Sequence, residues 1–272
     1  MAMSEKRKHW SATMIASSVV GALSVTGTAF AAPVQPAVEA ASGHYLAAPQ
    51  AMGEAEMVSA TIDLNTNDAA FLAQLGLIRG HLWVGMKLYE QGHIAMAKTH
   101  MKHPGDELYA GLESAFSARN LPGFATELTA LANAVNNDAP KTEIQTAYTE
   151  LKQAIAANEP VAQMSAKALF LSIASMLSVA GEEYAIGIKS GEVANVHEYQ
   201  DALGFTEIVL ERLDNLNSEQ QQQAAAEINQ VRERIIGLRE LWPTTTPSGR
   251  LSGDASAIYG AAAEIELTAL SM

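Results

Sequence analysis

Four of the chain's seven histidines lie in one short stretch, Gly80–Tyr109, which we call the histidine hairpin. They are His81, His93, His100 and His103. Gly92 divides the stretch, and glycine is the usual residue just past a helix end because it takes a positive φ without a Cβ clash. We therefore expect two antiparallel helices that meet at Gly92. This reversal brings His81 level with His100 and His103.

A carboxylate follows these histidines, because Glu107 comes one turn beyond Pro104. Three imidazoles and one carboxylate at one level suit a borderline transition-metal ion. We therefore name His81, His100, His103 and Glu107 as candidate metal ligands. The sequence leaves a structural alternative open, in which His103 caps a helix before Pro104 and His81 is a hydrogen-bonded interior side chain.

Two further candidates come from the second half of the chain. Glu183 ends an apolar helix, next to Glu182, where an acid is unusual unless it is paired. His197 stands alone beside Glu198, which a helix-capping box that starts at Asn195 would explain. We add Glu183 and His197 to the candidate metal ligands.

The sequence also limits the chemistry. There is no cysteine, which excludes a thiolate ligand, a disulfide and covalently attached c-type haem. No G-x-S-x-G or H-E-x-x-H motif is present, so we expect no enzyme. Met86, Met96 and Met101 lie near the histidines, and a Met–His mixture would suit copper(I), although such methionines more often fill a core.

The elements that must hold these residues are helical. Apolar residues recur at helical spacing from Phe71 to Leu82 after the capping residues Thr66–Asp68, and this helix should end near Glu90. We expect further helices at about 94–101, 104–118, 122–135, 140–157, 160–189, 195–213, 218–241 and 255–270. No stretch alternates with period two, so we predict no sheet. The fold class is all-α, an up-down helical bundle of about seven to nine helices.

The two halves show a similar order, with an apolar helix, a reversal at Gly92 or Gly191, and a helix that carries His, Glu and Tyr. This order fits two related helical hairpins, although the identity is too low to establish a duplication. Ala168–Ala180 is apolar on nearly all sides but is shorter than the roughly 20 residues of a membrane span. We predict a buried central helix here, and no stable membrane insertion of the mature chain.

The N-terminus has the pattern of a secretory signal peptide. A basic start at Lys6–Lys8 precedes the apolar stretch Met14–Val25 and the A-x-A site at Ala29–Ala31. We expect residues 1–31 to be removed, residues 32–60 to form a flexible leader, and residues 61–272 to form the helical bundle domain in the periplasm. The net charge of −13 disfavours nucleic acid and anionic membranes as partners and suits cations.

A resemblance covers residues 183–205, which read EYAIGIKSGEVANVHEYQDALGF. This segment resembles a part of the bacterial high-affinity iron permeases (the ferric transporter family) that lies outside their membrane-spanning region. The matching residues are Glu183, Tyr184, Gly191, Val193, Glu198 and Tyr199. The chain departs from that pattern because Ala185–Gly187 replace an expected proline. The permeases' Arg-Glu-x-x-Glu motif is also absent.

The resemblance implies an extracytoplasmic helical module without the channel, in a role connected with iron or another transition metal. We therefore predict a periplasmic transition-metal binding protein in metal uptake or homeostasis. Iron is the favoured ion, and zinc and copper are the alternatives. The other function considered is a non-enzymatic interaction module that docks on a membrane permease or sensor, with structural histidines.

Overall fold

The computed structural model of the chain describes residues 62–272, and at Asp106 and Glu107 it describes the backbone alone. The expected signal peptide (1–31) and flexible leader (32–60) lie outside the described residues. Both stay predictions, as does the exact start of the bundle domain.

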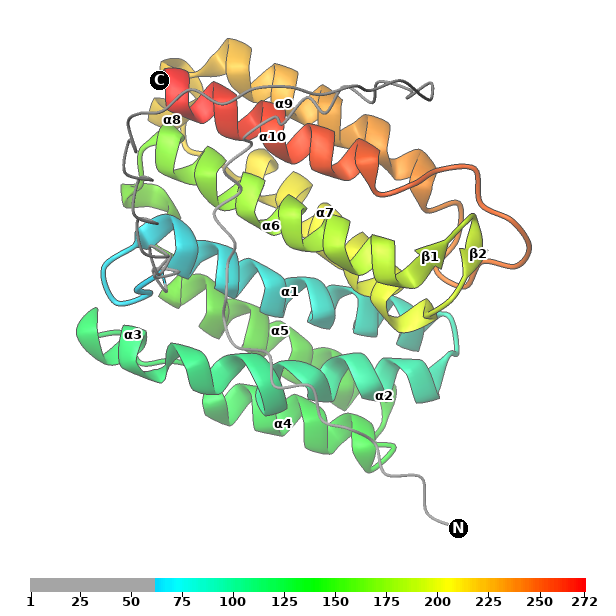
Figure 1. Cartoon of the computed structure of the whole chain (residues 1–272). Helices are drawn as coiled ribbons and strands as arrows, with labels where there is room; N and C mark the ends of the chain where they lie inside the picture. Colours follow the sequence, from blue (N-terminus) through cyan, green and yellow to red (C-terminus); the bar gives the residue numbers. More distant parts are fainter. Residues whose placement is uncertain (1–61) are drawn as a thin grey trace, which may run out of the picture. The chain divides into compact units, whose positions relative to one another are not determined.

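The described residues fold into α-helices joined by short connections (Figure 1). The helices are α1 (Asp68–Glu90), α2 (Ile94–His103), α3 (Glu113–Ala118), α4 (Ala125–Asn136), α5 (Lys141–Asn158), α6 (Ala166–Gly187), α7 (Val196–Asp214), α8 (Ser218–Gln223), α9 (Ala225–Leu238) and α10 (Ser256–Ser271). The predicted all-α class is confirmed. Residues 62–272 hold one helix more than expected, because the helix predicted at 218–241 is divided into α8 and α9.

Helix α1 lies at the centre of the bundle. It packs against α2 on one side and against α6 and α7 on the other, as Figure 1 shows. Helices α4 and α5 pack on each other, α4 against α2 and α5 against α1, while α10 covers α6 and α9 lies against α7 and α10. The N-terminal half (α1–α5) and the C-terminal half (α6–α10) therefore meet along α1.

Helix α6 has the length and apolar composition of a membrane span, with 22 residues and a mean hydropathy of 1.3 in its most apolar window. Of that window, 61% is buried inside the bundle. The helix packs against α1, α7 and α10, which accounts for its apolar surface. This packing agrees with the predicted buried central helix.

The reversal at Gly92 forms as predicted, with a φ of +84°. The backbone N–H of His93 donates to the carbonyl of Leu88, and that of Gly92 donates to Tyr89. These two bonds make a Schellman motif, which ends α1 and starts the antiparallel α2.

The reversal at Gly191 has a different structure. Two short strands, β1 (Ile188–Lys189) and β2 (Glu192–Val193), pair antiparallel there. Ser190 and Gly191 both have positive φ, of 54° and 80°, as the two-residue turn of a tight hairpin requires. The prediction of no sheet is wrong at this one place, because two-residue strands are too short to show alternation. The two reversals thus do not share one local structure.

The expected break at Pro104 does not occur. His103 is the last residue of α2, and Pro104–Leu108 continue as one π-helical turn, closed by the N–H of Tyr109 on the carbonyl of Pro104. A 3₁₀ turn, Tyr109–Leu112, then leads into α3. Proline fits here because it stands at the first position of the turn. His103 therefore does not act as a cap with a side-chain hydrogen bond.

Two helix starts differ slightly from the prediction. Asn195 caps α7, but its side chain accepts from the N–H of His197, and the expected capping box with Glu198 at N3 is not formed. The sequence Ser218–Gln221 predicts a capping box at the start of α8; one forms there, but its N-cap is Asn217 with Gln220 at N3, one residue earlier.

Helices α1 and α7 approach to backbone contact at two glycines. A Cβ on Gly204 would lie 2.3 Å from the carbonyl oxygen of Gly80, and a Cβ on Gly80 would lie 2.4 Å from the ring of Phe205. No other residue type fits this crossing without a shift of the helices. The crossing lies beside His81 on α1 and within one turn of Asp201 on α7.

Candidate metal centre

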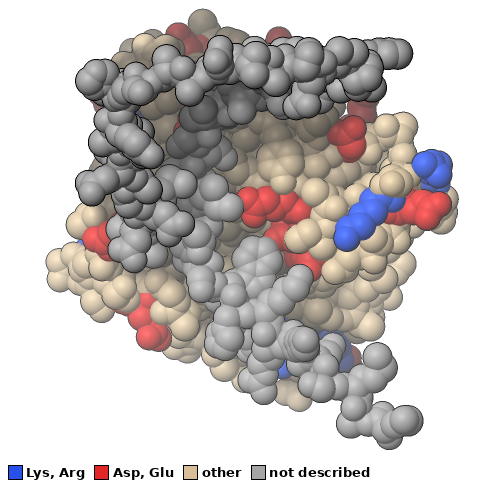
Figure 2. Space-filling model, viewed as in Figure 1, with Lys and Arg blue, Asp and Glu red and all other residues tan. Residues whose placement is uncertain are grey.

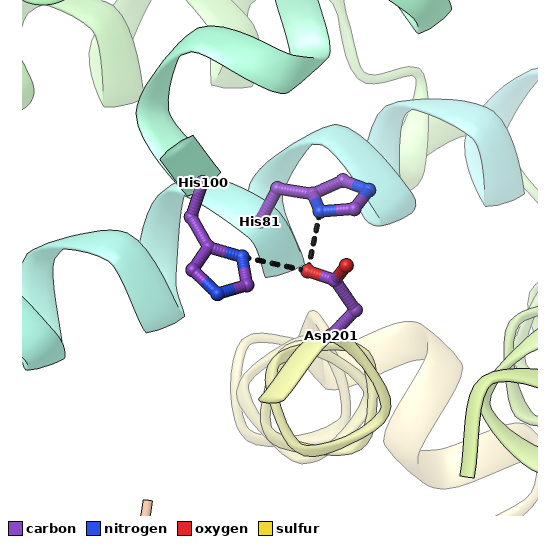
Figure 3. Close-up of side chains that lie close together, drawn as sticks. All are labelled: His81, His100 and Asp201. Atoms are coloured by element: carbon purple, nitrogen blue, oxygen red, sulfur yellow. Dashed lines mark hydrogen bonds and ion pairs between the residues drawn. The ribbon is translucent and has the colours of Figure 1, made fainter. Parts of the chain in front are cut away.

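The carboxylate of Asp201 on α7 lies between imidazoles from three helices. Its Oδ1 is 2.5 Å from Nδ1 of His81 on α1 and 2.9 Å from Nδ1 of His100 on α2 (Figure 3). Its Oδ2 is 3.1 Å from Nδ1 of His197, one turn earlier on α7. Asp201 is 1% exposed and His100 is fully buried, so these contacts form away from water.

A fourth histidine completes the group, which we call the histidine cluster: His81, His100, His103 and His197. The ring of His103 lies 4.9 Å from that of His81 and 5.5 Å from that of His197, measured between centroids. His100 and His197 stack in parallel at 4.0 Å. The structure thus brings together four of the six candidate ligands.

The other two candidates have different positions. Glu183 on α6 is buried and hydrogen-bonds to Glu198, which lies beside His197. The structure does not describe the Glu107 side chain, so its role as a ligand stays a prediction. His93 is exposed, outside the histidine cluster.

Asp201 is the residue that the sequence reasoning missed. One signal was present, because Asp201 follows His197 by four residues, so both side chains lie on one face of α7. The second signal is an acid surrounded by apolar residues on a helix, which is rare unless the acid has partners. Both patterns also occur at ordinary surface positions, so neither identified the site by itself.

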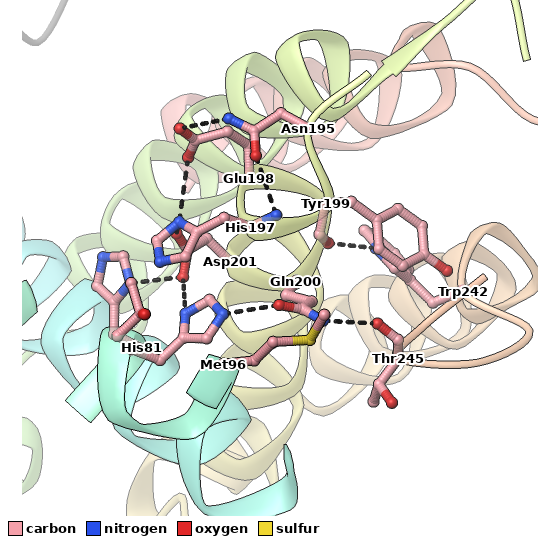
Figure 4. Close-up of polar contacts among 12 residues, drawn as sticks. His81, Met96, Asn195, His197, Glu198, Tyr199, Gln200, Asp201, Trp242 and Thr245 are labelled. Atoms are coloured by element: carbon pink, nitrogen blue, oxygen red, sulfur yellow. Dashed lines mark hydrogen bonds and ion pairs between the residues drawn. The ribbon is translucent and has the colours of Figure 1, made fainter. Parts of the chain in front are cut away.

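Gln200 fixes the orientation of the His100 ring (Figure 4). The Gln200 amide nitrogen donates to the carbonyl of Thr245 at 2.9 Å, so its oxygen faces Nε2 of His100 at 2.8 Å. Nε2 therefore donates a proton to that oxygen. The opposite nitrogen, Nδ1, faces the Asp201 carboxylate. Nδ1 and the Asp201 carboxylate would both be acceptors in a neutral ring. Either a proton or a metal ion must therefore lie between them.

Charges around Asp201 follow from these contacts. Burial by itself would raise the pKa of Asp201, but the charge of His81 and hydrogen bonds from the surrounding histidines hold that pKa well below its usual value. Burial likewise opposes charge on His197, yet its bonds to Asp201 and Glu198 raise its pKa to about 10. Without a metal, Asp201 is therefore an anion paired with a protonated His197.

His103 and Glu183 have the opposite character. Burial, together with the neighbouring His81, lowers the pKa of His103 to about 4. Burial and the hydrogen bond to Glu198 raise the pKa of Glu183 to about 9. At neutral pH His103 is thus an uncharged base, and Glu183 is a carboxylic acid that shares its proton with Glu198.

The donor atoms fit the dimensions of a metal site. Those of His81, His100 and Asp201 all lie within 4.8 Å of one another, as do those of His197, Glu198 and Asp201. Ligands bonded at about 2.1 Å lie roughly 3–3.5 Å apart around one ion. Small side-chain adjustments therefore admit an ion, and two imidazoles with one carboxylate form a set that ferrous iron takes.

The surface is consistent with a cationic ligand. Most charged side chains visible on the described part of the face in Figure 2 are acidic, and the basic ones lie toward its margins. This agrees with the chain's net charge of −13. Such a surface raises the local concentration of cations.

Comparison with known families identifies the C-terminal half. Residues 162–271 match the family model of the iron permease-associated 4-helix bundle domain. The match spans the four long helices α6, α7, α9 and α10 and contains the segment 183–205, so the predicted resemblance is confirmed and extends further. This family is connected with transporters rather than enzymes. No curated protein and no solved structure matches the chain.

The matched segment holds only part of the histidine cluster. His197, together with Asp201, Glu198 and Glu183, lies within it. His81, His100 and His103 lie before it, on α1 and α2. The candidate centre therefore forms where the matched bundle packs against the helices that precede it.

Proposed function

We propose that this protein binds iron outside the cytoplasm and serves iron uptake or homeostasis. The main observation that supports this function is the buried Asp201 carboxylate, with Nδ1 of His81 and Nδ1 of His100 both within 2.9 Å of one of its oxygens. The match to a domain associated with iron permeases supports iron over zinc and copper.

The proposed ligands are one negatively charged carboxylate and a set of uncharged imidazoles. Asp201 supplies the negative charge, and the imidazoles of His81 and His100 supply nitrogens. His103 lies next to His81 as an uncharged base and can supply a further nitrogen. Because bound imidazoles must be deprotonated, protons compete with iron for these nitrogens, and iron affinity should fall as the pH is lowered.

The periplasm is the proposed compartment. The N-terminal pattern of residues 1–31 and the association of the matched domain with membrane permeases both support it. In this role the bundle would hold the ion for a permease, without catalysis of its own.

Metal content tests this function. The purified protein would be incubated with Fe²⁺ without oxygen, or with Zn²⁺ or Cu²⁺, then desalted and analysed by mass spectrometry. We expect at least one iron per chain in the wild type, less iron in His100→Ala, and the wild-type content in His93→Ala, the matched change at an exposed histidine. Circular dichroism would check that each variant folds. Equal traces of metal in all three proteins would overturn the proposal.

A docking module is the second candidate function. The observation that favours it is that Asp201 already has three hydrogen-bond partners inside the fold, so a structural role accounts for its burial. This function predicts that a membrane permease binds the bundle equally well with and without metal. Binding that requires loaded iron would contradict it.

A further inference from the structure

The two oxygens of Asp201 face two different groups of donors. Oδ1 contacts His81 and His100, whereas Oδ2 contacts His197, which lies beside Glu198 (Figure 4). A carboxylate that presents one oxygen to each of two donor groups can bridge two metal ions. Facing helices of a bundle supply such paired sites from glutamate and histidine side chains.

We propose that the protein binds two metal ions, with Asp201 as the bridging ligand. The first ion takes His81 and His100 and is the one in the proposed function, on which this inference rests. The second ion takes His197, Glu198 and the other oxygen of Asp201.

The distances within the second group support a site. Nδ1 of His197 is 3.1 Å from Oδ2 of Asp201 and 3.9 Å from Oε2 of Glu198. The first distance lies within the roughly 3–3.5 Å between neighbouring ligands of one ion, and the second lies slightly above it. The amide of Asn195 holds the other oxygen of Glu198 at 3.3 Å, which orients that carboxylate toward His197.

An independent observation comes from a polar atom left without a partner. Among the described residues, Oε2 of Glu183 is buried and makes no hydrogen bond. Glu183 as a whole is 4% exposed and its carboxyl group is bonded to Glu198. A buried polar atom without a partner is costly, and proteins accept it mainly where another ligand completes the site. Glu183 thus extends the second group as a fourth donor or as a support for Glu198.

Charge and proton balance are consistent with a divalent ion. The second ion replaces the proton on His197, and Glu183 can release its own proton as well. Both protons leave to solvent. Asp201, Glu198 and Glu183 then provide three negative charges for two divalent ions. The second group is richer in oxygen than the first, so it favours iron(II) or manganese(II) over copper(I).

The test counts ions per chain. The full protein would be loaded with Fe²⁺ without oxygen, separated from free metal, and analysed by mass spectrometry. The key variant is Glu198→Gln, which keeps the shape of the side chain and an acceptor for Asn195. Glu192→Gln is its matched control, because Glu192 is an exposed acid on β2. We expect two ions in the wild type and in Glu192→Gln, and one ion in Glu198→Gln.

Manganese(II) provides a second readout. Two Mn²⁺ ions that share a carboxylate are magnetically coupled, so the loaded wild type should show a coupled electron paramagnetic resonance spectrum. Glu198→Gln should show the spectrum of isolated Mn²⁺. One ion in every protein would overturn the paired site and leave the proposed function standing. Two ions in Glu198→Gln would also overturn it, whereas no ion in the wild type would overturn the proposed function itself.

Discussion

The side-chain oxygen of Gln200 lies 2.8 Å from Nε2 of His100, and the same amide donates to the backbone of Thr245. Gln200 thereby fixes both the plane of the imidazole and the nitrogen that carries its proton. Nδ1 of His100, which faces Asp201, is therefore the nitrogen available to bind a cation. This pair therefore connects a residue outside the ligand set to metal affinity.

Replacement of Gln200 should weaken iron binding without loss of the ligands. We expect Gln200→Leu to lower iron affinity by about 10–100-fold, because His100 loses the acceptor that orients its ring. Competition with a coloured chelator measures the change. Gln145→Leu, at an exposed position of α5, is the control. Equal affinities in both variants would show that Gln200 has no part in the site.

The glycine crossing of α1 and α7 should be intolerant of a methyl group. Gly204→Ala places a Cβ against the carbonyl of Gly80, and we expect it to lower the free energy of unfolding by about 2–3 kcal/mol and to reduce iron binding. Gly237→Ala on α9, where nothing lies within 4 Å, should have little effect. Urea denaturation and metal content measure both outcomes. A Gly204→Ala protein with normal stability would contradict the close crossing.

A buried ion network also ties the two halves together. Arg212 is 2% exposed and donates to Glu159 at 3.1 Å, and Glu159 also pairs with Arg79 at 2.9 Å. Glu159→Gln should cost roughly 3–5 kcal/mol, because it leaves buried charge on Arg212 uncompensated.

The matched control is Glu264→Gln, which removes an exposed pair with Arg234 and should cost less than about 1 kcal/mol. Chemical denaturation of both variants measures the difference. Similar losses would indicate that water reaches Arg212.

The buried acid of Glu183 should make stability depend on pH. Its folded pKa of about 9 exceeds the unfolded value of 4.5, so the folded state keeps a proton that the unfolded state releases between these values. The stabilisation is complete below the unfolded pKa and is lost as the pH rises through the folded pKa. For the metal-free protein we therefore expect the free energy of unfolding to fall from about pH 5 to about pH 9.

Glu183→Gln removes this titration. The variant should be more stable than the wild type near pH 8, by an amount on the order of a few kcal/mol that shrinks toward pH 5. Thermal unfolding at several pH values measures the two curves. Parallel curves would mean that Glu183 is ionised in the folded protein.

Local features of this chain could be predicted from its sequence. Helical periodicity, the reversal at Gly92 and the burial of α6 each depend on residues close together in the chain, so the sequence alone indicates them. The same reasoning placed His81 level with His100 and His103, because one short turn constrains an antiparallel pair. It failed at Pro104 and at β1–β2, where a π turn and two-residue strands leave no distinct pattern.

Contacts between distant segments were decided only by the tertiary structure. The sequence contains Asp201 as one acid among many, and its importance comes from α7 lying against α1 and α2. That packing depends on Gly80 and Gly204, whose missing side chains let the two backbones touch. A sequence specifies such a crossing only through the sum of many weak apolar contacts, which no local spacing reveals. The residue types indicated that the histidines could bind a metal ion. The packing of the helices determined which carboxylate lies beside them.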